Sequence, residues 1–300
     1  MHHSDRSSDA LGVDHRVSIM GIVNVTPDSF SDGVPKNYVE HAIAHAIRLE
    51  NQGADILDVG GESTRPGAMP VSEEEECARV LPVIEALASR VRIPISIDTS
   101  KAYVMRAAIK AGASIINDVN ALRSPGALEA AAQLQVPVVL MHMEGEPRTM
   151  QNTPKYTHVV EDVFDFLQNR ICAARNAGIP KKHILIDPGF GFGKTPTHNF
   201  ELLAGLNYFA KLGVPILVGL SRKSCLGVLC EREVPRDRIF ASVAAHLIAV
   251  QKGARIVRVH DVGATRDALK VWNAVQSITQ ASATDTPKNL QVIPLPGVAE

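Results

Sequence analysis

Two carboxylates and one amide stand directly after short apolar runs: Asp98 after "ISI", Asn117 after "II" and Asp187 after "ILI". A carboxylate can accept two parallel N–H bonds, and an amide offers both donors and an acceptor. One use of such groups is to bind a flat heterocycle with an amidine-like N–H edge. Another is a general acid–base pair of the kind found in glycosidases. Spacing along the sequence does not measure their separation, so residue types alone leave both uses open.

Cationic side chains gather late in the chain. Arg222 and Lys223 follow the apolar run 216–219, and Arg258 and His260 alternate with Val at the end of another run. A solvated basic face is the ordinary explanation for such a cluster. Alternation within a Val/Ile strand, however, directs both Arg258 and His260 to one face of that strand. The pattern therefore favours a site for a phosphate-like anion.

Two polar loops are too long to serve only as connections. The first, "NVTPDSFSDG" at 24–33, offers an amide, two carboxylates and three hydroxyl groups. The second, "GGESTRPGA" at 60–68, has glycines at its base. Both are predicted to be mobile.

A third stretch, "PGFGFGKT" at 188–195, looks like a phosphate-binding loop. The Walker pattern requires glycine at its first position, and Pro188 stands there instead. We interpret it as a flexible loop with Phe190 and Phe192 as apolar contacts near the rim of a site.

These groups need a frame that brings strand ends together. Short apolar runs, near-continuous in Val, Ile and Leu, alternate with segments of helical spacing, and such runs are typical of strands buried on both faces. The runs are 18–23, 55–59, 95–97, 114–116, 136–141, 183–186, 216–219 and 256–259. The helical segments are about 37–52, 72–90, 101–111, 124–134, 155–177, 198–212, 236–252 and 264–278.

Eight strand–helix units in a chain of 300 residues predict an α/β fold, a single-domain (β/α)8 TIM barrel with long mobile loops after strands 1 and 2. The alternative is a doubly wound open sheet, which usually has about five or six strands. The predicted boundaries are a flexible segment at 1–15, the barrel at 16–279 and a flexible tail at 280–300. A barrel places its site at the carboxyl ends of the strands, where all the groups above fall.

Charge and composition exclude some classes of binding partner. Lys and Arg number 31 against 32 acidic residues, so no basic excess predicts nucleic acid as a partner. No run approaches the roughly 20 apolar residues of a membrane span. The four cysteines show no C-x-x-C spacing, which favours free thiols in a reducing compartment. The first residues lack the apolar core of a secretory signal, so a cytoplasmic protein is expected.

Eight motifs occur in order at the predicted strand ends: "MGIVNVTPDSFSDG", "DVGGESTRPGA", "ISIDTSK", "IINDV", "LMHM", "IDPGFGFGK", "GLSRKS" and "RVHDV". Together they resemble the dihydropteroate synthase family of pterin-binding barrels, from about Ile19 to about Trp272. The resemblance implies a folate-biosynthesis transferase. It would condense 6-hydroxymethyl-7,8-dihydropterin diphosphate with 4-aminobenzoate, by a dissociative C–N bond formation, to 7,8-dihydropteroate and diphosphate. It also implies Mg²⁺ as cofactor, a homodimer through outer helices, and sulfonamides as competitors of aminobenzoate.

The resemblance also implies residue roles. The expected pterin-binding residues are Asp98, Asn117, Met141, Asp187, Gly219 and Lys223. The aminobenzoate pocket and its loops are expected to involve Thr64, Arg65, Pro66, Phe30, Phe192 and Ser221. Diphosphate is expected to meet Asn24, Arg65, Arg258 and His260, with Asn24 as the magnesium ligand. The resemblance further implies that the first loop, 24–33, closes over the site as a lid that excludes water. The expected catalytic set is Asp98, Asp187, Lys223, Arg258, His260 and, on this lid, Asp28.

Two rival functions share much of this pattern. A pterin-dependent methyltransferase domain would share the pterin carboxylates and Asn117, but it would need neither the first loop nor the late cationic cluster. A catalytically silent pterin-binding paralogue would be expected to have lost a residue of the loop or of the cluster, and the sequence retains them. Mixing the protein with both substrates and Mg²⁺ and measuring diphosphate distinguishes the enzyme from the paralogue.

Overall fold

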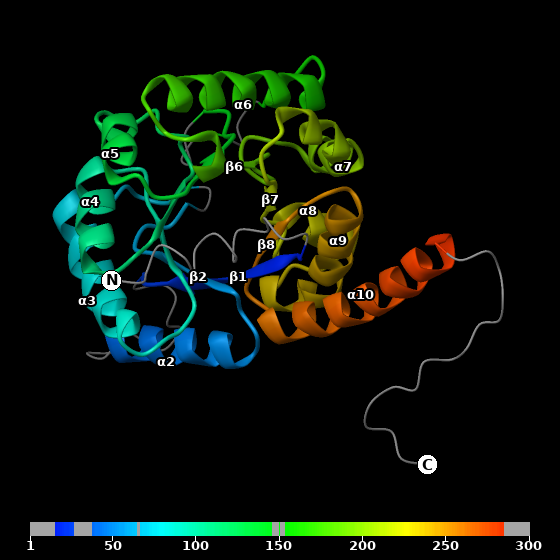
Figure 1. Cartoon of the computed structure of the whole chain (residues 1–300), viewed down its shortest axis with the longest axis horizontal. Coiled ribbons are helices and arrows are strands. Elements are labelled where there is room, and N and C mark those ends of the chain that lie inside the picture. The colour runs from blue at the N-terminus through cyan, green and yellow to red at the C-terminus, as the bar shows by residue number, and fades with distance from the viewer. Residues whose placement is uncertain (1–15, 27–37, 65–66, 146–149, 151–153, 285–300) are drawn as a thin grey trace, which may run out of the picture.

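The computed structural model describes residues 16–26, 38–64, 67–145, 150 and 154–284. Within them, eight parallel strands alternate with helices, which surround the strands (Figure 1). The strands pair in the order β6-β5-β4-β3-β2-β1-β8-β7. An isolated parallel bridge between Ile186 and Ile216 joins the two ends of this series. The sheet is therefore closed into a barrel, which confirms the (β/α)8 prediction over the open sheet.

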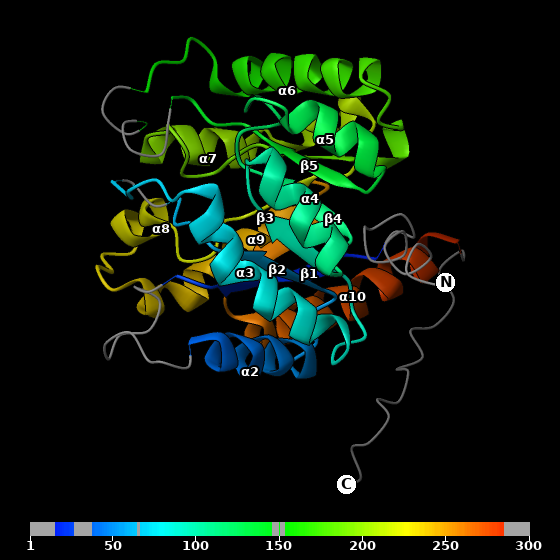
Figure 2. The same ribbon diagram turned by 90° about the vertical axis from the view of Figure 1, so that its left-hand side faces the viewer.

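The strands are β1 (Ser18–Asn24), β2 (Ile56–Gly60), β3 (Ile95–Asp98), β4 (Ile115–Asp118), β5 (Val138–Met141), β6 (Ile184–Asp187), β7 (Leu217–Val218) and β8 (Ile256–Val259). The α-helices are α2 (Tyr38–Asn51), α3 (Glu73–Ala88), α4 (Ala102–Ala111), α5 (Ala127–Leu134), α6 (Val159–Asn176), α7 (Pro196–Ala204), α8 (Ser224–Leu229), α9 (Ile239–Gln251) and α10 (Val262–Thr284). In both views α2 and α6 lie on opposite sides of the barrel (Figures 1 and 2).

Side chains on each strand alternate between the barrel interior and the surrounding helices. The outward residues, such as Ile19, Leu57 and Ile97, belong to one continuous core with the helices. The inward residues form a separate, fully buried apolar cluster: Met20, Ile56, Ile115, Val139, Leu185, Leu217 and Ile256. This cluster fills the barrel interior and forms a floor below the carboxyl ends of the strands.

The predicted elements differ from the observed ones mainly in the second half of the barrel. The predicted helix 198–212 is divided at Gly205 into α7 and a 3₁₀ helix, Leu206–Leu212. A Cβ at Gly205 would lie 2.8 Å from Val160, so a side chain there would collide with α6. The short helix α8 was not predicted, because six residues are too few to show a helical period.

Two boundaries also differ. Strand β7 has only two residues, so Gly219 lies beyond its end. Helix α10 continues to Thr284, past the predicted helix end at 278 and into the segment predicted as tail. Residues 1–15 and 285–300 lie outside the described residues. No helix in the described part of the chain is long and apolar enough to span a bilayer.

Candidate active site

A polar layer lies directly above the apolar floor, because most of its residues follow those of the floor by two positions on the same strands, and Asp98 follows the buried Ser96 in the same way on β3. Two residues apart on a strand means the same face, so these side chains also point into the barrel. The layer comprises Asp58, Asp98, Asn117, Met141, Asp187 and Arg258, with Gly219 just beyond β7. Except for Asp58, which lies in the middle of β2, they stand at or next to the carboxyl ends of their strands, as predicted for a barrel site.

Arg258 joins two of the acids in this layer. Its Nε donates to Asp58 Oδ2 at 2.6 Å, and its Nη2 donates to Asp98 Oδ2 at 2.7 Å. Burial alone would lower the pKa of Arg258, but the charges of Asp58 and Asp98 raise it above its usual value. Burial raises the pKa of Asp98 to about 7, although the Arg258 charge opposes this shift. The guanidinium therefore spans β2, β3 and β8 on the acidic side of the pocket.

Asp58 also fixes the orientation of Asn117. The Asn117 amide, which is 4% exposed, donates from Nδ2 to Asp58 Oδ2 at 3.0 Å. A carboxylate only accepts, so this bond turns the Asn117 carbonyl oxygen away from Asp58. Asn117 thereby keeps an acceptor for a ligand N–H group.

Asp187 lies on the other wall of the barrel. Its Oδ1 accepts a hydrogen bond from Gly189 N at 2.7 Å, and burial raises its pKa to about 6. A Cβ at Gly219 would lie 3.9 Å from Asp187 Oδ2 and also 3.9 Å from Arg258 Cβ. These three strand ends therefore face one space. Burial lowers the pKa of Lys223 to about 8, although the Asp187 charge raises it.

An apolar wall completes this side of the layer. Met141 packs with Met143 and Met150, and the half-buried ring of Phe192 lies against this group. The Lys223 ammonium stands 4.0 Å from the centre of the Phe192 ring. Thioether side chains suit flat aromatic surfaces because they are polarizable and flexible.

The cationic residues late in the chain, Arg222, Lys223, Arg258 and His260, bind different partners. Arg222 makes a two-pronged ion pair with Asp261, at 3.0 and 2.6 Å, and Arg258 is held by the acids described above. Ser221 Oγ lies 2.9 Å from His260 Nδ1 and accepts from the His260 backbone N–H at 3.1 Å. The loop after β7 and the end of β8 are thus held together around Ser221.

The loops after β1 and β2 begin side by side. Asn24 pairs in register with Gly60, and Val25 N donates to Gly60 O at 2.8 Å. Thr64 is half-buried farther along the second loop. Asp28, Phe30, Arg65 and Pro66 lie outside the described residues, so the roles predicted for them stay predictions.

The base of the second loop is held by charged groups. Lys101 Nζ donates to Glu62 at 2.5 Å and also pairs with the fully buried Glu76. Glu62 accepts a further bond from Val71 N at 3.0 Å, which ties the two ends of the loop together. Burial raises the pKa of Glu76, although its bond to Lys101 opposes this shift.

The sequence did not single out Asp58, although a signal was present. An acid within "ILDVG" stands in the same inward phase as Ile56, which marks it as a polar residue inside an apolar strand. Asp118, by contrast, faces outward, and its two oxygens accept from Asn120 N and Leu122 N, each at 2.7 Å. Asp118 is therefore a structural cap.

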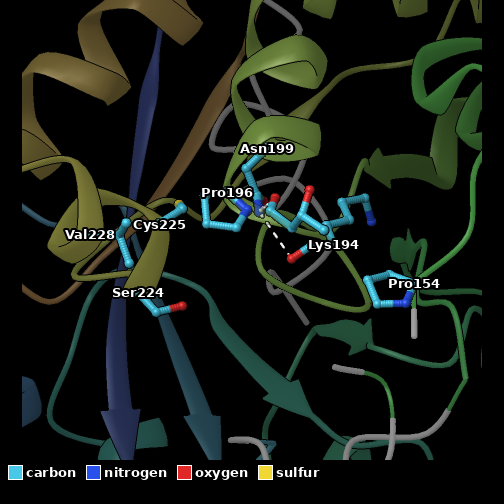
Figure 3. A pocket seen from close by; sticks show the side chains of 8 residues that line it. Pro154, Lys194, Pro196, Asn199, Ser224, Cys225 and Val228 are labelled. Atoms are coloured by element: carbon cyan, nitrogen blue, oxygen red, sulfur yellow. Dashed lines mark hydrogen bonds between the residues drawn. The ribbon is translucent and has the colours of Figure 1, made fainter. Parts of the chain in front are cut away.

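A cavity of about 210 Å³ lies outside this layer, between the loop after β6, α7 and α8 (Figure 3). It is lined by Pro154, Lys194, Thr195, Pro196, Asn199, Ser224, Cys225 and Val228. It contains none of the residues of the polar layer. The candidate active site is therefore the carboxyl-end layer of the barrel rather than this cavity.

The structure is a closed (β/α)8 barrel with inward acids, an amide and a methionine wall at its carboxyl end. Comparison with known proteins leads to a family of enzymes with this kind of site. The family described as pterin binding enzyme matches residues 20–260. The dihydropteroate synthase of Haemophilus influenzae is 53% identical over 256 residues, which cover 85% of this chain and 93% of that protein.

Solved structures show the same likeness. A Xanthomonas albilineans dihydropteroate synthase with 4-aminobenzoic acid is 59% identical, with a TM-score of 0.84 and coverage of 87% of this chain and 94% of that one. A structure from the same organism in complex with 7,8-dihydropteroate is 56% identical, with a TM-score of 0.81 and the same coverage. The chain belongs to the pterin-binding enzyme family and, within it, to the dihydropteroate synthases, so it is a transferase.

Proposed function

We propose that this chain condenses 6-hydroxymethyl-7,8-dihydropterin diphosphate with 4-aminobenzoate to form 7,8-dihydropteroate and diphosphate. The observation that carries the proposal is the inward polar layer, in which opposed carboxylates, an oriented amide and a methionine wall share one space. That space suits a flat bicyclic ring with several N–H groups along one edge. The related Xanthomonas albilineans structures, with aminobenzoic acid and with dihydropteroate, support the same chemistry.

In this proposal the pterin lies against Met141, with its N–H edge shared among Asp98, Asn117 and Asp187. Asn117 presents a carbonyl oxygen because its amide group is bound to Asp58. Lys223 donates to the ring carbonyl oxygen. Each unpaired buried N–H would cost about 1–3 kcal/mol, so this set of partners selects the pterin edge.

The proposed chemical step is dissociative. The bond between the pterin methylene carbon and the diphosphate oxygen breaks first, and its electron pair leaves with diphosphate. The aminobenzoate nitrogen then attacks the methylene cation and afterwards loses a proton. Buried carboxylates at Asp58, Asp98 and Asp187 favour a cation in this space, since electrostatic terms are strong where water is excluded.

On the leaving-group side, Arg258, His260 and Asn24 are proposed to meet the diphosphate. Arg258 is shared with Asp58 and Asp98, so it links recognition of the pterin to the departing anion. Asn24 supplies an oxygen of the kind that Mg²⁺ prefers. The described residues hold no cluster of three or more His, Cys, Asp or Glu side chains able to hold a metal. Mg²⁺ commonly takes one or two protein ligands and completes its shell with phosphates and water, and Asn24 fits that arrangement.

The direct test is to mix the protein with the pterin diphosphate, Mg²⁺ and 4-aminobenzoate, and to measure both diphosphate and dihydropteroate. Formation of both products in equal amounts is expected. The matched control is Asp187→Asn, which keeps the size of the side chain but removes its charge. Pterin binding without any product would support the silent paralogue, and methyl transfer to a corrinoid in place of condensation would support the methyltransferase.

We also propose a homodimer through α9 and α10, which pack against each other. Phe240 on α9 is 88% exposed, and Val271, Val275 and Ile278 form an exposed stripe on α10. Beyond the ring of helices, α10 projects outward (Figure 1). Exposed apolar side chains gathered in this way mark a protein interface. Sedimentation velocity of Val271→Glu/Val275→Glu should give monomers, whereas Tyr103→Glu on α4 should leave the dimer intact.

We propose the cytoplasm as the compartment. Cys77, Cys172, Cys225 and Cys230 are all free thiols in the structure. Free thiols persist where the compartment is reducing, which supports this proposal. Fractionation of the native host with an antibody to the chain would test it.

A further inference from the structure

The loop after β6 lies tightly against the segment that follows β5. Gly189 and Gly193 have positive φ angles of 71° and 61°. A Cβ at Gly189 would lie 1.8 Å from the His142 carbonyl oxygen, and one at Gly193 would lie 2.5 Å from that of Glu144. Phe190 is fully buried in the main core rather than at the rim, where the sequence placed it. The loop is therefore anchored in place, unlike the flexible loop predicted from its glycines.

The ammonium group of Lys194 fastens this loop. Lys194 is only 3% exposed, and its Nζ lies 2.9 Å from His142 Nδ1, 2.9 Å from Gly189 O and 3.1 Å from Phe192 O. An ammonium group has three N–H donors, so these three acceptors use all of them. Two of the acceptors belong to the loop and the third belongs to the end of β5. Burial lowers the pKa of Lys194 to about 7, while the charge of Asp187 raises it. The three acceptors favour the charged form, because a buried charge is tolerated only when it is bonded in this way.

His142 is suited to the role of acceptor. Burial lowers its pKa to about 2, and the charges of Lys194 and Arg123 act in the same direction. Its ring is therefore neutral, with the proton on Nε2 and the lone pair of Nδ1 facing Lys194. The edge of the ring packs against Phe166, with ring centres 4.8 Å apart. The β5 side of the anchor is thus fixed in orientation.

The loop after β6, held by Lys194, contacts two charged groups of the proposed site, Asp187 and Lys223. Gly189 N holds Asp187 Oδ1 at 2.7 Å, and the Phe192 ring stands 4.0 Å from Lys223 Nζ. A second bond, from Tyr156 Oη to Gly193 O at 2.8 Å, holds the loop independently of Lys194. On loss of Lys194 the Phe192 carbonyl oxygen loses its hydrogen bond, although the neighbouring Gly193 is still held by Tyr156. At the other end Gly189 keeps both its bond to Asp187 and its contact with His142, so the Phe192 end would shift more than the Asp187 end.

We propose that Lys194 is a positioning residue for the aminobenzoate side of the site: it holds Phe192 at a fixed place beside Lys223. The inference rests on the proposed function, because it assigns the ring of Phe192 to the aminobenzoate pocket. Lys194 does not contact the reacting atoms. It acts through the carbonyl oxygens of the loop.

The test is Lys194→Met, which keeps the length of the side chain and removes its donors, with the exposed Lys182→Met as the matched control. The KM for aminobenzoate should rise about tenfold or more, the effect of losing one charge-assisted hydrogen bond. The dissociation constant for dihydropterin, measured by calorimetry, should change less than about threefold. Lys182→Met should match the parent. The condensation activity of the parent protein is measured first. If the parent forms no dihydropteroate, the proposed function fails, and this outcome is distinct from failure of the role proposed for Lys194.

A double-mutant cycle separates positioning from general stability. In a Phe192→Ala background, Lys194→Met should leave the aminobenzoate KM unchanged, because the ring that it positions is absent. If Lys194→Met does not fold, His142→Leu removes only the β5 acceptor and should raise the same KM by a smaller factor. A folded Lys194→Met with the parent KM, or an equal rise with and without Phe192, would overturn the inference.

Discussion

Replacing Asp58 by Asn tests the electrostatic design of the site more sharply than any other single change. Asp58 is fully buried, and its Oδ2 accepts from both Arg258 and Asn117, at 2.6 and 3.0 Å. Its Oδ1 has no partner among the described residues. Asn can keep its oxygen at the Oδ2 position and place its amide nitrogen at the Oδ1 position. The substitution therefore retains the shape and both acceptor contacts, while it removes the negative charge.

The size of the effect follows from those contacts. Two charge-assisted bonds become weaker, by about 1 kcal/mol each, and the new buried amide lacks an acceptor, so the free energy of unfolding should fall by about 3–5 kcal/mol. Arg258 should then move toward Asp98, which leaves that acid less available to a ligand. The affinity for dihydropterin should fall about tenfold, or about 1.4 kcal/mol.

Urea unfolding followed by circular dichroism measures the first quantity, and titration calorimetry with a dihydropterin measures the second. Asp118→Asn is the matched control, since Asp118 is equally buried but faces outward and caps the turn at 120–122. It should lose stability and keep the parent affinity. If Asp58→Asn binds dihydropterin as tightly as the parent, or if Asp118→Asn weakens binding equally, the assignment of Asp58 to the site is wrong.

Three further predictions follow from the same geometry. Burial raises the pKa of Asp187 from 3.8 to about 6, so the folded protein holds a proton that the unfolded chain has lost. This carboxyl should make folding less favourable, and dihydropterin binding tighter, as pH rises from about 4 to about 6. Unfolding and calorimetry across that range should show both slopes in the parent and smaller slopes in Asp187→Asn, where the raised pKa of Asp98 still contributes. Chelation of Mg²⁺ should abolish turnover, and Asn24→Ala should raise the Mg²⁺ concentration needed for half-maximal rate; an unchanged requirement would remove Asn24 as a ligand. A sulfonamide should raise the KM for aminobenzoate in steady-state assays without lowering kcat, whereas a fall in kcat alone would place it elsewhere.

The sequence predicted the barrel well because strand phase is a local property. Val, Ile and Leu runs give the strands, and a barrel brings the carboxyl ends of its strands together, so Asn117, Asp187 and Arg258 were all expected at one site. These conclusions need only the period of two and the order of the elements.

Contacts between distant strands could not be predicted in the same way. The pairing of Arg258 with Asp58 joins residues that are 200 positions apart, and only the closed barrel brings them together. The sequence placed Arg258 on the diphosphate alone, whereas the structure also commits it to the acids. The anchored loop after β6 was misjudged because glycines indicate either mobility or close packing. Only its contact with His142 distinguishes the two.

The junction between β6 and β7 is the place where the barrel is expected to open locally most easily. All neighbouring strands except β6 and β7 are joined by continuous backbone pairing. In the described structure the junction of β6 and β7, here called the seam, is closed by the two-residue strand β7 and one isolated bridge. Local opening costs least where the fewest backbone bonds must break, so amide exchange near Ile186 and Ile216 should outpace exchange in β1 and β2. Asp187 and Gly219 flank the seam. Opening of this seam is therefore expected to change the distance between Asp187 and Gly219, whereas Asp58 and Asp98 stand on β2 and β3, which are paired along their length.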